Sequence, residues 1–281
     1  MTSATSPVGA TGSAGSADAS DVPVLELVDA RVRYRDRQEG GYFEAVRGVS
    51  LTVGRGEALG LVGESGCGKS STIRAILGLA PLSEGRLLID GVAVDPRDRA
   101  VRSRIGAIFQ NPAGSFNPRR SLLDSVAEPL RVWRGGSRAD RERAALAELD
   151  RVGVTELMAR RRPHEVSGGQ CQRAAIARAT VLGPEILICD EPVSALDVSI
   201  QAQVLVLLDE LRTQAGLAML FISHDLAVVA TLCDRTAVMN AGEIVEVGTT
   251  ADIADRPQHA YTKLLHDSVP SHLFLTNSGS S

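Results

Sequence analysis

Short apolar runs alternate with longer segments of helical character along most of the chain. Continuous apolar runs at 58–62, 186–189 and 217–223 are typical of strands buried on both faces of a parallel sheet. Segments with apolar residues at helical spacing, among them 167–182 and 197–214, separate these runs. Strands that alternate with helices predict an α/β domain with a mainly parallel sheet and right-handed crossovers.

Further strands are expected outside this alternation. Apolar and polar residues alternate at 24–34 and at 46–53, and the polar segment 35–41 between them predicts a hairpin-like loop. Shorter apolar runs bounded by turn residues predict additional strands at 85–91, 105–109, 236–240 and 243–247. The chain therefore begins with a β-rich part.

A helical segment of different composition follows the strand expected at 105–109. Residues 111–120 are rich in Pro, Asn and Gly, whereas 122–133 and 138–152 show helical spacing with many Arg and Glu residues. We therefore expect a helical insert at about 112–166. Its larger apolar residues could line a cleft or form the insert's own core; these are Phe116, Leu122, Leu123, Leu130 and Trp133.

Composition limits the possible functions. Of 281 residues, 44% are hydrophobic and 23% are charged, which is typical of a globular protein. A net charge of −4 leaves no excess of basic residues for a general nucleic-acid binder. No apolar run approaches the roughly 18–20 residues that cross a bilayer. Residues 1–21 have neither a basic start nor an apolar middle, so we expect a disordered tail rather than a signal peptide.

The strongest chemical signal is a glycine-rich run after the apolar strand at 58–62. It matches the pattern G-x-x-x-x-G-K-[ST] and precedes a segment with helical spacing. Its glycines allow backbone N–H groups to turn inward, and the positive end of the helix dipole points at the same place. Lys69 adds a charge for the β- and γ-phosphates, and Ser70 adds a hydroxyl for Mg²⁺. We predict a nucleoside triphosphate site formed by Gly63, Glu64, Ser65, Gly66, Cys67, Gly68, Lys69, Ser70 and Ser71.

Two acids follow the buried strand at 186–189. Ligands bind at the carboxyl ends of strands in open α/β folds, which is where these acids should lie. Asp190 would hold Mg²⁺ through water, and Glu191 would polarise the attacking water. The alternative is a solvated acidic pair, which a phosphate loop in the same chain disfavours.

A second helix terminus suited to anions is expected at 166–170. Ser167 can cap this helix, and the two glycines after it allow close backbone approach. Together with the runs 190–197 and 223–225, this segment resembles the motif set of ABC-type ATPases. The resemblance covers nearly all of residues 24–270, with the motifs in the family's order.

The resemblance implies a fold and a division of the chain. The fold would be that of a phosphate-loop NTPase of the RecA-like class, with a parallel-sheet core, an N-terminal antiparallel β subdomain and a helical insert subdomain. The ATPase domain would occupy 22–250 and a C-terminal extension 251–281. The cofactors would be ATP and Mg²⁺.

The resemblance also implies roles for individual residues. Gln110 would sense Mg²⁺ and the attacking water, act as a metal-side residue and couple to a transmembrane partner. His224 would contact the γ-phosphate, and the loop that ends at Asp197 would touch a second subunit. The ATP held by that subunit's phosphate loop would bind the signature residues, which are Ser167, Gly168, Gly169 and Gln170.

For the adenine ring the resemblance points to Tyr34, which lies at a suitable distance upstream of the phosphate loop. Tyr42 and Phe43 are nearby alternatives. Any of the three could instead belong to the core, so the sequence leaves this contact open.

Within the family, the chain resembles the ATPases of dipeptide, oligopeptide and nickel importers, on the runs 109–119, 162–165 and 257–265. It looks more like the second of the two ATPases in such systems. This implies a second ATPase subunit, identical or paralogous, two integral-membrane permease subunits and, indirectly, an extracytoplasmic solute-binding protein. The chain would lie at the cytoplasmic face of the cell membrane. The alternative is a soluble ABC-type ATPase that assembles or remodels an enzyme complex such as a carbon–phosphorus lyase.

Overall fold

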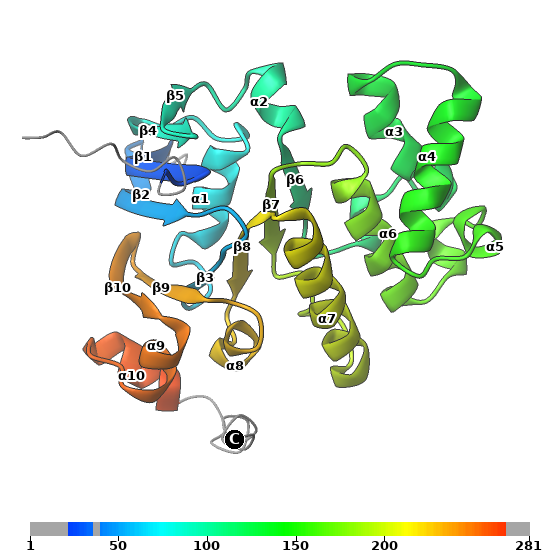
Figure 1. The fold of residues 1–281 in the computed structure, drawn as a ribbon. Coiled ribbons are helices and arrows are strands. Elements are labelled where there is room, and N and C mark those ends of the chain that lie inside the picture. The colour runs from blue at the N-terminus through cyan, green and yellow to red at the C-terminus, as the bar shows by residue number, and fades with distance from the viewer. Residues whose placement is uncertain (1–21, 36–39, 268–281) are drawn as a thin grey trace, which may run out of the picture.

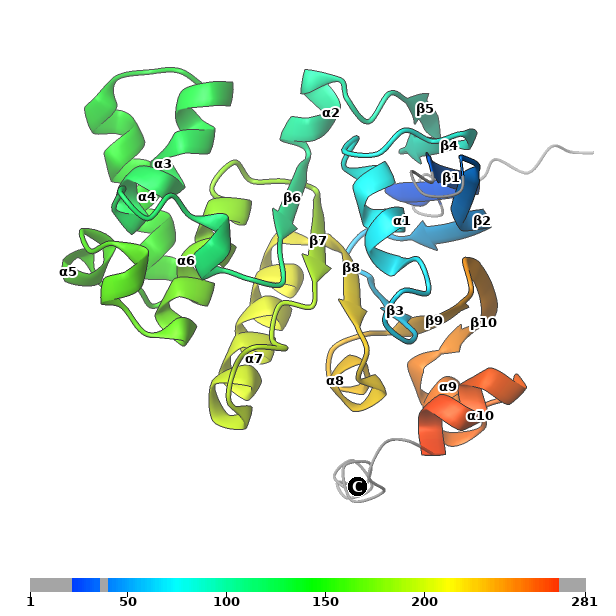
Figure 2. The ribbon, with the colours of Figure 1, turned by 180° about the vertical axis from the view of Figure 1, so that it is seen from behind.

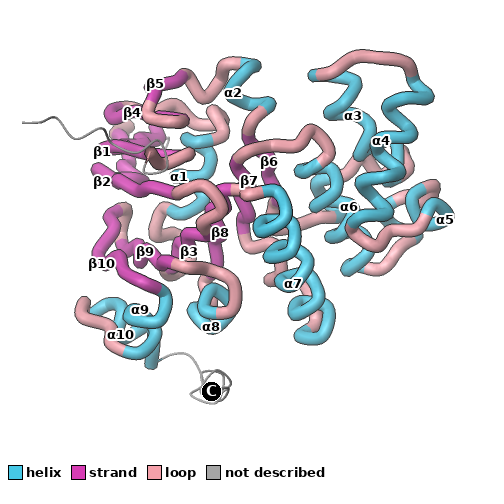
Figure 3. The backbone as a smooth tube through the Cα atoms, in the orientation of Figure 1, coloured by secondary structure: helices cyan, strands magenta, loops and turns pink. Residues whose placement is uncertain are grey.

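The computed structural model describes residues 22–35 and 40–267 (Figure 1). The tail expected at 1–21, most of the loop expected at 35–41 and the end of the expected C-terminal extension lie outside these residues. Two β-sheets lie at one side of the molecule and a group of helices at the other. Figure 3 shows this separation by the colours of strands and helices.

The larger sheet has six strands in the order β10-β9-β3-β8-β7-β6. All neighbours are parallel except β10, which pairs antiparallel with β9, so the predicted mainly parallel sheet is confirmed. Every residue of β3 and β8 is buried, as their continuous apolar sequences require. The strands are β3 (Ala58–Val62), β6 (Ile105–Ile108), β7 (Ile186–Asp190), β8 (Ala218–Ser223), β9 (Arg235–Asn240) and β10 (Glu243–Thr249).

The smaller sheet is antiparallel, with four strands in the order β2-β1-β4-β5. Buried and more exposed residues alternate along much of β1, because one face packs on the core. The sequence pattern placed the start of β2 too late and missed β5, a three-residue edge strand with little apolar burial. The strands are β1 (Leu25–Arg35), β2 (Tyr42–Val53), β4 (Glu84–Ile89) and β5 (Val92–Val94).

Four helices adjoin strands of the larger sheet along the chain. They are α1 (Lys69–Ile76), α6 (Gly168–Thr180), α7 (Val198–Ala215) and α8 (Leu226–Ala230). Helix α6 precedes β7, and the other three each follow a strand. Helix α1 lies between the two sheets, where it contacts β1, β2 and β7. Outside the insert, the described residues form three short helices at segments where the sequence pattern predicted none; they are α2 (Arg99–Ser103), α9 (Thr250–Asp255) and α10 (Ala260–Asp267).

The helical insert packs on the side of α6 that faces away from the sheet (Figure 2). Its helices are α3 (Leu122–Trp133), α4 (Arg138–Arg151) and α5 (Glu156–Ala159). Ser121 and Ser137 cap α3 and α4 by accepting hydrogen bonds from backbone N–H groups, so these helices begin where predicted. The structure decides between cleft and core for most of the large apolar residues: Phe116, Leu122, Leu123 and Leu130 are at most 5% exposed and belong to the core.

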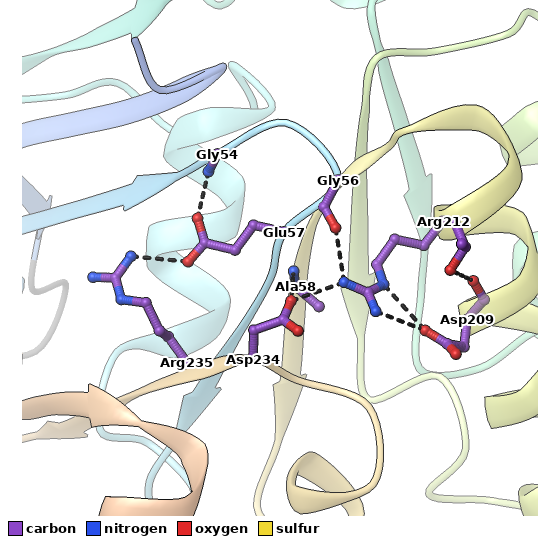
Figure 4. Close-up of polar contacts among 9 residues, drawn as sticks. Gly54, Gly56, Glu57, Ala58, Asp209, Arg212, Asp234 and Arg235 are labelled. Carbon is purple, nitrogen blue, oxygen red and sulfur yellow. Dashed lines mark hydrogen bonds and ion pairs between the residues drawn. The ribbon is translucent and has the colours of Figure 1, made fainter. Parts of the chain in front are cut away.

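A polar network holds the start of β3, the strand that leads into the glycine-rich loop (Figure 4). Arg212 of α7 donates from Nη1 to the carbonyl oxygen of Gly56 at 2.7 Å and to Asp234 Oδ2 at 2.8 Å. The same carboxylate oxygen accepts a hydrogen bond from Ala58 N at 2.8 Å. Further contacts join Glu57 to Gly54 and to Arg235.

None of the helices in the described part of the chain combines the length and the apolar character needed to cross a bilayer.

Candidate functional site

The glycine-rich run forms a tight loop between β3 and α1. A Cβ atom on Gly63 would lie 2.2 Å from the carbonyl oxygen of Met239, and one on Gly68 would lie 2.5 Å from that of Ala45. Gly68 also has a φ of 118° and Gly66 a φ of 85°, and residues with a side chain rarely adopt such positive values. The fold of this chain therefore requires glycine at these positions, whether or not a ligand is present.

Lys69 folds back over this loop. Its Nζ atom donates to the carbonyl oxygens of Gly63 at 2.6 Å and Glu64 at 2.8 Å. The side chain is buried, and its Nζ lies 3.8 Å from Cys67 Sγ. The ammonium group is thus satisfied within the loop, at the place where an anion bound by the loop would meet a positive charge.

A pocket of about 460 Å³ opens beside the loop. It brings together the N-terminal sheet, the start of α1, the second residue after β6 and the residues that follow β7 and β8. It contains many of the residues predicted from the sequence, and its lining is Tyr34, Phe43, Ala45, Ser65, Gly66, Gly68, Lys69, Ser70, Ser71, Gln110, Glu191 and His224.

Glu191 lies at the centre of the polar groups in this pocket. Gln110 donates from Nε2 to Glu191 Oε2 at 2.8 Å, and His224 Nδ1 lies 3.4 Å from Glu191 Oε1. Glu191 itself has a φ of 46°, an uncommon conformation for a residue other than glycine. Its backbone N–H donates to Ile222 O at 3.0 Å, which ties this turn to the neighbouring strand. The carboxylate is therefore contacted by side chains that follow two other strands, β6 and β8, while the backbone of Glu191 is tied to β8.

Asp190 ends β7, one residue before this centre. Burial raises the pKa of its carboxyl, and the adjacent charge of Glu191 raises it further, against the opposing effects of Arg74 and Lys69. A cation beside Asp190 would offset both the burial and the repulsion. Gln110 lines a neighbouring pocket together with Asp190 and also lines the pocket beside the loop together with Ser70. Ser70 and Gln110 both carry oxygen atoms, which are the ligands that Mg²⁺ prefers. This donor set fits a magnesium ion.

The segment 166–170 lies elsewhere. Ser167 caps α6: its Oγ accepts from Gln170 N at 3.3 Å, while Gln170 Oε1 accepts from Ser167 N at 3.0 Å. The cap predicted from the sequence is confirmed. None of these residues lines the pocket beside the glycine-rich loop. The structure thus separates two groups of residues that the sequence assigned to nucleotide binding.

The two glycines of this segment differ from those of the loop. Gly168 is exposed, and a Cβ atom there would approach only Leu196, at 3.8 Å. A Cβ atom on Gly169 would meet Ile200 Cγ2, the end of a side chain, at 2.7 Å. Asp197 caps α7 by accepting from Ile200 N at 3.0 Å, so the loop that ends at Asp197 lies beside the signature segment. Nothing within the described chain requires glycine at 168.

Two of the three candidate aromatic residues lie in the pocket. Tyr34 and Phe43 are paired across β1 and β2, and both line it. Tyr42 is 75% exposed and is not among the lining residues. Tyr34 packs partly against the core, whereas Phe43 is 55% exposed, so the structure leaves these two as candidates for stacking.

The sequence patterns did not predict one polar contact to the glycine-rich loop. Tyr261, on α10, accepts a hydrogen bond at its hydroxyl oxygen from Glu64 N at 2.9 Å. No spacing pattern could have paired residues so far apart, because the contact depends on how the C-terminal helices pack.

Comparison with known proteins agrees with this geometry. The family model described as "ABC transporter" matches residues 46–194, more than half of the chain. The chain belongs to the ABC transporter family. A second model, described as "Oligopeptide/dipeptide transporter, C-terminal region", matches residues 245–275. The family recognised from the sequence motifs is therefore confirmed, and the chain is an ATPase of this family that binds nucleotide.

The similar curated proteins are ATP-binding subunits. The "Oligopeptide transport ATP-binding protein OppF" of Escherichia coli (strain K12) is 46% identical over 259 residues, which cover 88% of this chain and 78% of that protein. The "Oligopeptide transport ATP-binding protein AppF" of Bacillus subtilis (strain 168) is 42% identical over 262 residues, covering 90% of this chain and 80% of that protein.

Solved structures confirm the fold. The ATP-binding cassette MJ0796, as a dimer in a post-hydrolysis state bound to ADP and Pi, superimposes with a TM-score of 0.72 at 29% identity. The match covers 80% of this chain and 98% of that one. CbiO1 from Clostridium perfringens, part of the ABC transporter complex CbiONQ, has the same TM-score of 0.72 at 27% identity, covering 84% and 93%. The predicted phosphate-loop NTPase fold is confirmed.

Proposed function

We propose that this chain is the ATP-hydrolysing subunit of an importer for peptides or a related solute. The names of the similar proteins support the solute class, and so does the match of residues 245–275 to the C-terminal region of oligopeptide and dipeptide transporters. The alternative of a soluble ATPase that remodels an enzyme complex is not favoured, because these relatives are transport proteins. The ATPase domain would occupy 22–250 and the C-terminal extension 251–281.

The pocket beside the glycine-rich loop would bind ATP. The backbone N–H groups of the loop and Lys69 would hold the phosphates, and Tyr34 or Phe43 would stack on the adenine. Bound Mg²⁺ would neutralise charge that develops on the phosphates during hydrolysis. The residues that would hold it are Ser70, Gln110 and, through water, Asp190.

Glu191 would act as the general base for hydrolysis. Its carboxylate would accept a proton from water as that water attacks the γ-phosphate. Gln110 would orient Glu191 through the 2.8 Å hydrogen bond and also contact the water. His224, within 3.4 Å of the same carboxylate, would contact the γ-phosphate. The observation that carries this assignment is the convergence of three side chains from different strand ends.

The signature segment 166–170 would bind ATP held by a second ATPase subunit, identical or paralogous. Its exposure and its absence from this chain's own pocket support that division. A glycine that the chain itself does not require, at 168, is what a close approach by an external phosphate would need. Asp197, beside the segment, would touch the same subunit. ATP would thus be bound between two subunits.

A second pocket, of about 720 Å³, offers a docking place for a permease subunit. Phe109 is 38% exposed there, and Trp133 lines the same pocket. Gln110 lines both this pocket and the one beside the phosphate loop, so it links permease docking to Glu191. Two permease subunits would hold the chain at the cytoplasmic face of the cell membrane and receive solute from an extracytoplasmic binding protein.

Purification of the tagged chain from its own membranes in detergent tests this proposal. We expect two integral-membrane proteins and a second ATPase to co-purify, identified by mass spectrometry. Phe109→Glu should lose the membrane proteins, whereas Val206→Glu, on an exposed face of α7, should keep them. Recovery of a soluble enzyme complex in place of the membrane proteins would overturn the transport assignment.

A further inference from the structure

The C-terminal helices touch the phosphate loop through one hydrogen bond. Tyr261, the second residue of α10, accepts at its hydroxyl oxygen from Glu64 N at 2.9 Å. The side chain is half-buried, and burial raises the pKa of its phenol, so the hydroxyl is neutral at physiological pH. A neutral hydroxyl in this position is a good acceptor for a backbone N–H group.

The N–H group of Glu64 belongs to the same peptide unit as the carbonyl group of Gly63. That carbonyl oxygen accepts from Lys69 Nζ at 2.6 Å. Tyr261 and Lys69 therefore hold the two ends of one peptide group. Hydrogen bonds at both ends of a peptide polarise it and strengthen each other, and together they prevent the peptide plane from turning.

The position of Tyr261 is itself well determined. Glu246, on β10, accepts from Gln258 N at 2.8 Å and from His259 N at 2.9 Å, just before α10 begins. The N–H group of Tyr261 donates to His259 Nδ1 at 3.2 Å. The turn between β9 and β10 is tied to the loop as well, since Gly242 N donates to Cys67 O at 2.8 Å. The C-terminal part thus braces the loop at two points.

We propose that Tyr261 is a positioning residue for ATP binding: its hydroxyl fixes the Gly63–Glu64 peptide and, through the carbonyl group of that peptide, the place of Lys69. Tyr261 is not among the residues that line the pocket, so it would act on bound phosphates through the loop. It pre-organises the loop, so that less conformational freedom is lost when the phosphates bind. This inference rests on the proposed function, namely that residues 63–71 bind ATP.

Tyr261→Phe tests the inference because it removes the hydroxyl and keeps the ring. We expect the dissociation constant for MgATP to rise about 2- to 10-fold, which corresponds to the net contribution of one hydrogen bond to binding. In the assembled transporter the KM for ATP should rise by the same factor while kcat stays within about twofold, because the bound loop reaches the same arrangement. Fluorescent-nucleotide titration and steady-state hydrolysis measure these quantities.

Two comparisons separate positioning from simple destabilisation. Thr249→Val removes the N-cap of α9, where Thr249 Oγ1 accepts from Asp252 N at 3.1 Å, and should lower the melting temperature without changing ATP affinity. In a Lys69→Ala background, Tyr261→Phe should have little further effect on affinity, because the group it positions is gone. Full additivity of the two substitutions would overturn the inference, as would an ATP affinity in Tyr261→Phe equal to that of the wild type.

The same experiment distinguishes failure of this inference from failure of the proposed function. If the wild type does not bind MgATP, or if Lys69→Ala binds it equally well, the assignment of the loop itself fails. If Lys69→Ala weakens binding and Tyr261→Phe does not, only the role of Tyr261 is wrong.

Discussion

The glycine-rich loop and the signature segment both place glycines at the start of a helix, but they differ in what requires glycine there. In the loop, glycine is required by this chain: Gly63 and Gly68 lie against the backbone of Met239 and Ala45. The ammonium group of Lys69 is bonded within the loop. The loop is therefore complete as a structure before any ligand arrives.

The signature segment shows the opposite relation. It is exposed at Ser167 and Gly168, and Ser167 and Gln170 cap the helix through reciprocal hydrogen bonds. No backbone within the described chain comes near enough to Gly168 to exclude a side chain. The comparison teaches that the two glycine segments are constrained differently: packing within the chain requires glycine in the loop, whereas at Gly168 the chain leaves room, and the proposed contact with a second subunit would supply the requirement.

The largest effect is expected at Glu191, the proposed general base in the pocket beside the loop. Glu191→Gln replaces the proposed base by a neutral group of the same shape, so hydrolysis should fall about 10²- to 10⁴-fold. ATP binding should remain, and the pair of subunits should stay closed, which size-exclusion chromatography with MgATP would detect. Glu243→Gln, at the exposed start of β10, should leave turnover unchanged. Normal turnover in Glu191→Gln would remove Glu191 from the mechanism.

The second-largest effect is expected on ATP affinity when Lys69 in the glycine-rich loop is replaced. Lys69→Ala removes a charged hydrogen-bond donor to phosphate, and the affinity for ATP should fall about 10- to 100-fold. Titration with a fluorescent nucleotide measures the change. The only other lysine of the chain, Lys263, supplies the control. It is exposed on α10, so the Lys263→Ala variant should bind ATP like the wild type. Equal affinities in the two variants would contradict the assignment of the loop.

A pair of glycine substitutions tests the comparison directly. Gly63→Ala should lower the free energy of unfolding by about 1–3 kcal/mol, because its methyl group meets backbone that cannot move aside. Gly168→Ala should raise it by up to about 1 kcal/mol, since alanine favours the helix and the site has room. Chemical denaturation of the isolated chain measures both.

Hydrolysis by the assembled transporter should respond differently to the second substitution. In Gly168→Ala it should fall at least about tenfold, because the added methyl group keeps the partner's phosphates from the signature. A Gly168→Ala variant with wild-type hydrolysis would show that the segment does not meet ATP closely.

The smallest effect is expected at Asp190, and it depends on pH. Because its pKa is raised in the folded chain, the unfolded chain releases this proton first as pH rises, and stability is lost between the ordinary pKa of Asp and the raised value. Without Mg²⁺ and nucleotide, Asp190→Asn should therefore be slightly more stable than the wild type at neutral pH. The difference should vanish below about pH 4, where the wild-type carboxyl is protonated in both states. Urea denaturation at several pH values measures it, and a less stable Asn variant at neutral pH would contradict the assigned cause.

The sequence alone determined the features that depend on neighbours along the chain. The apolar run before Gly63 and the helical spacing after Lys69 define a strand, a loop and a helix that follow one another directly in the sequence. The same holds for the cap at Ser167 and for helix α3, whose start at Leu122 follows from the serine before it. Helix caps, glycines and apolar periodicity determine the local structure of residues that are close in the sequence, so the sequence pattern is sufficient to predict it.

Only the tertiary structure decided which distant residues meet. Gln110, Glu191 and His224 come from three strand ends, and their distances depend on the register of the parallel sheet. Tyr261 reaches Glu64 only because the C-terminal helices pack beside the loop. Burial of Phe116 in the insert, rather than in a cleft, likewise depends on how α6 packs. Such contacts follow from packing of the whole chain, which no local pattern of residues encodes by itself.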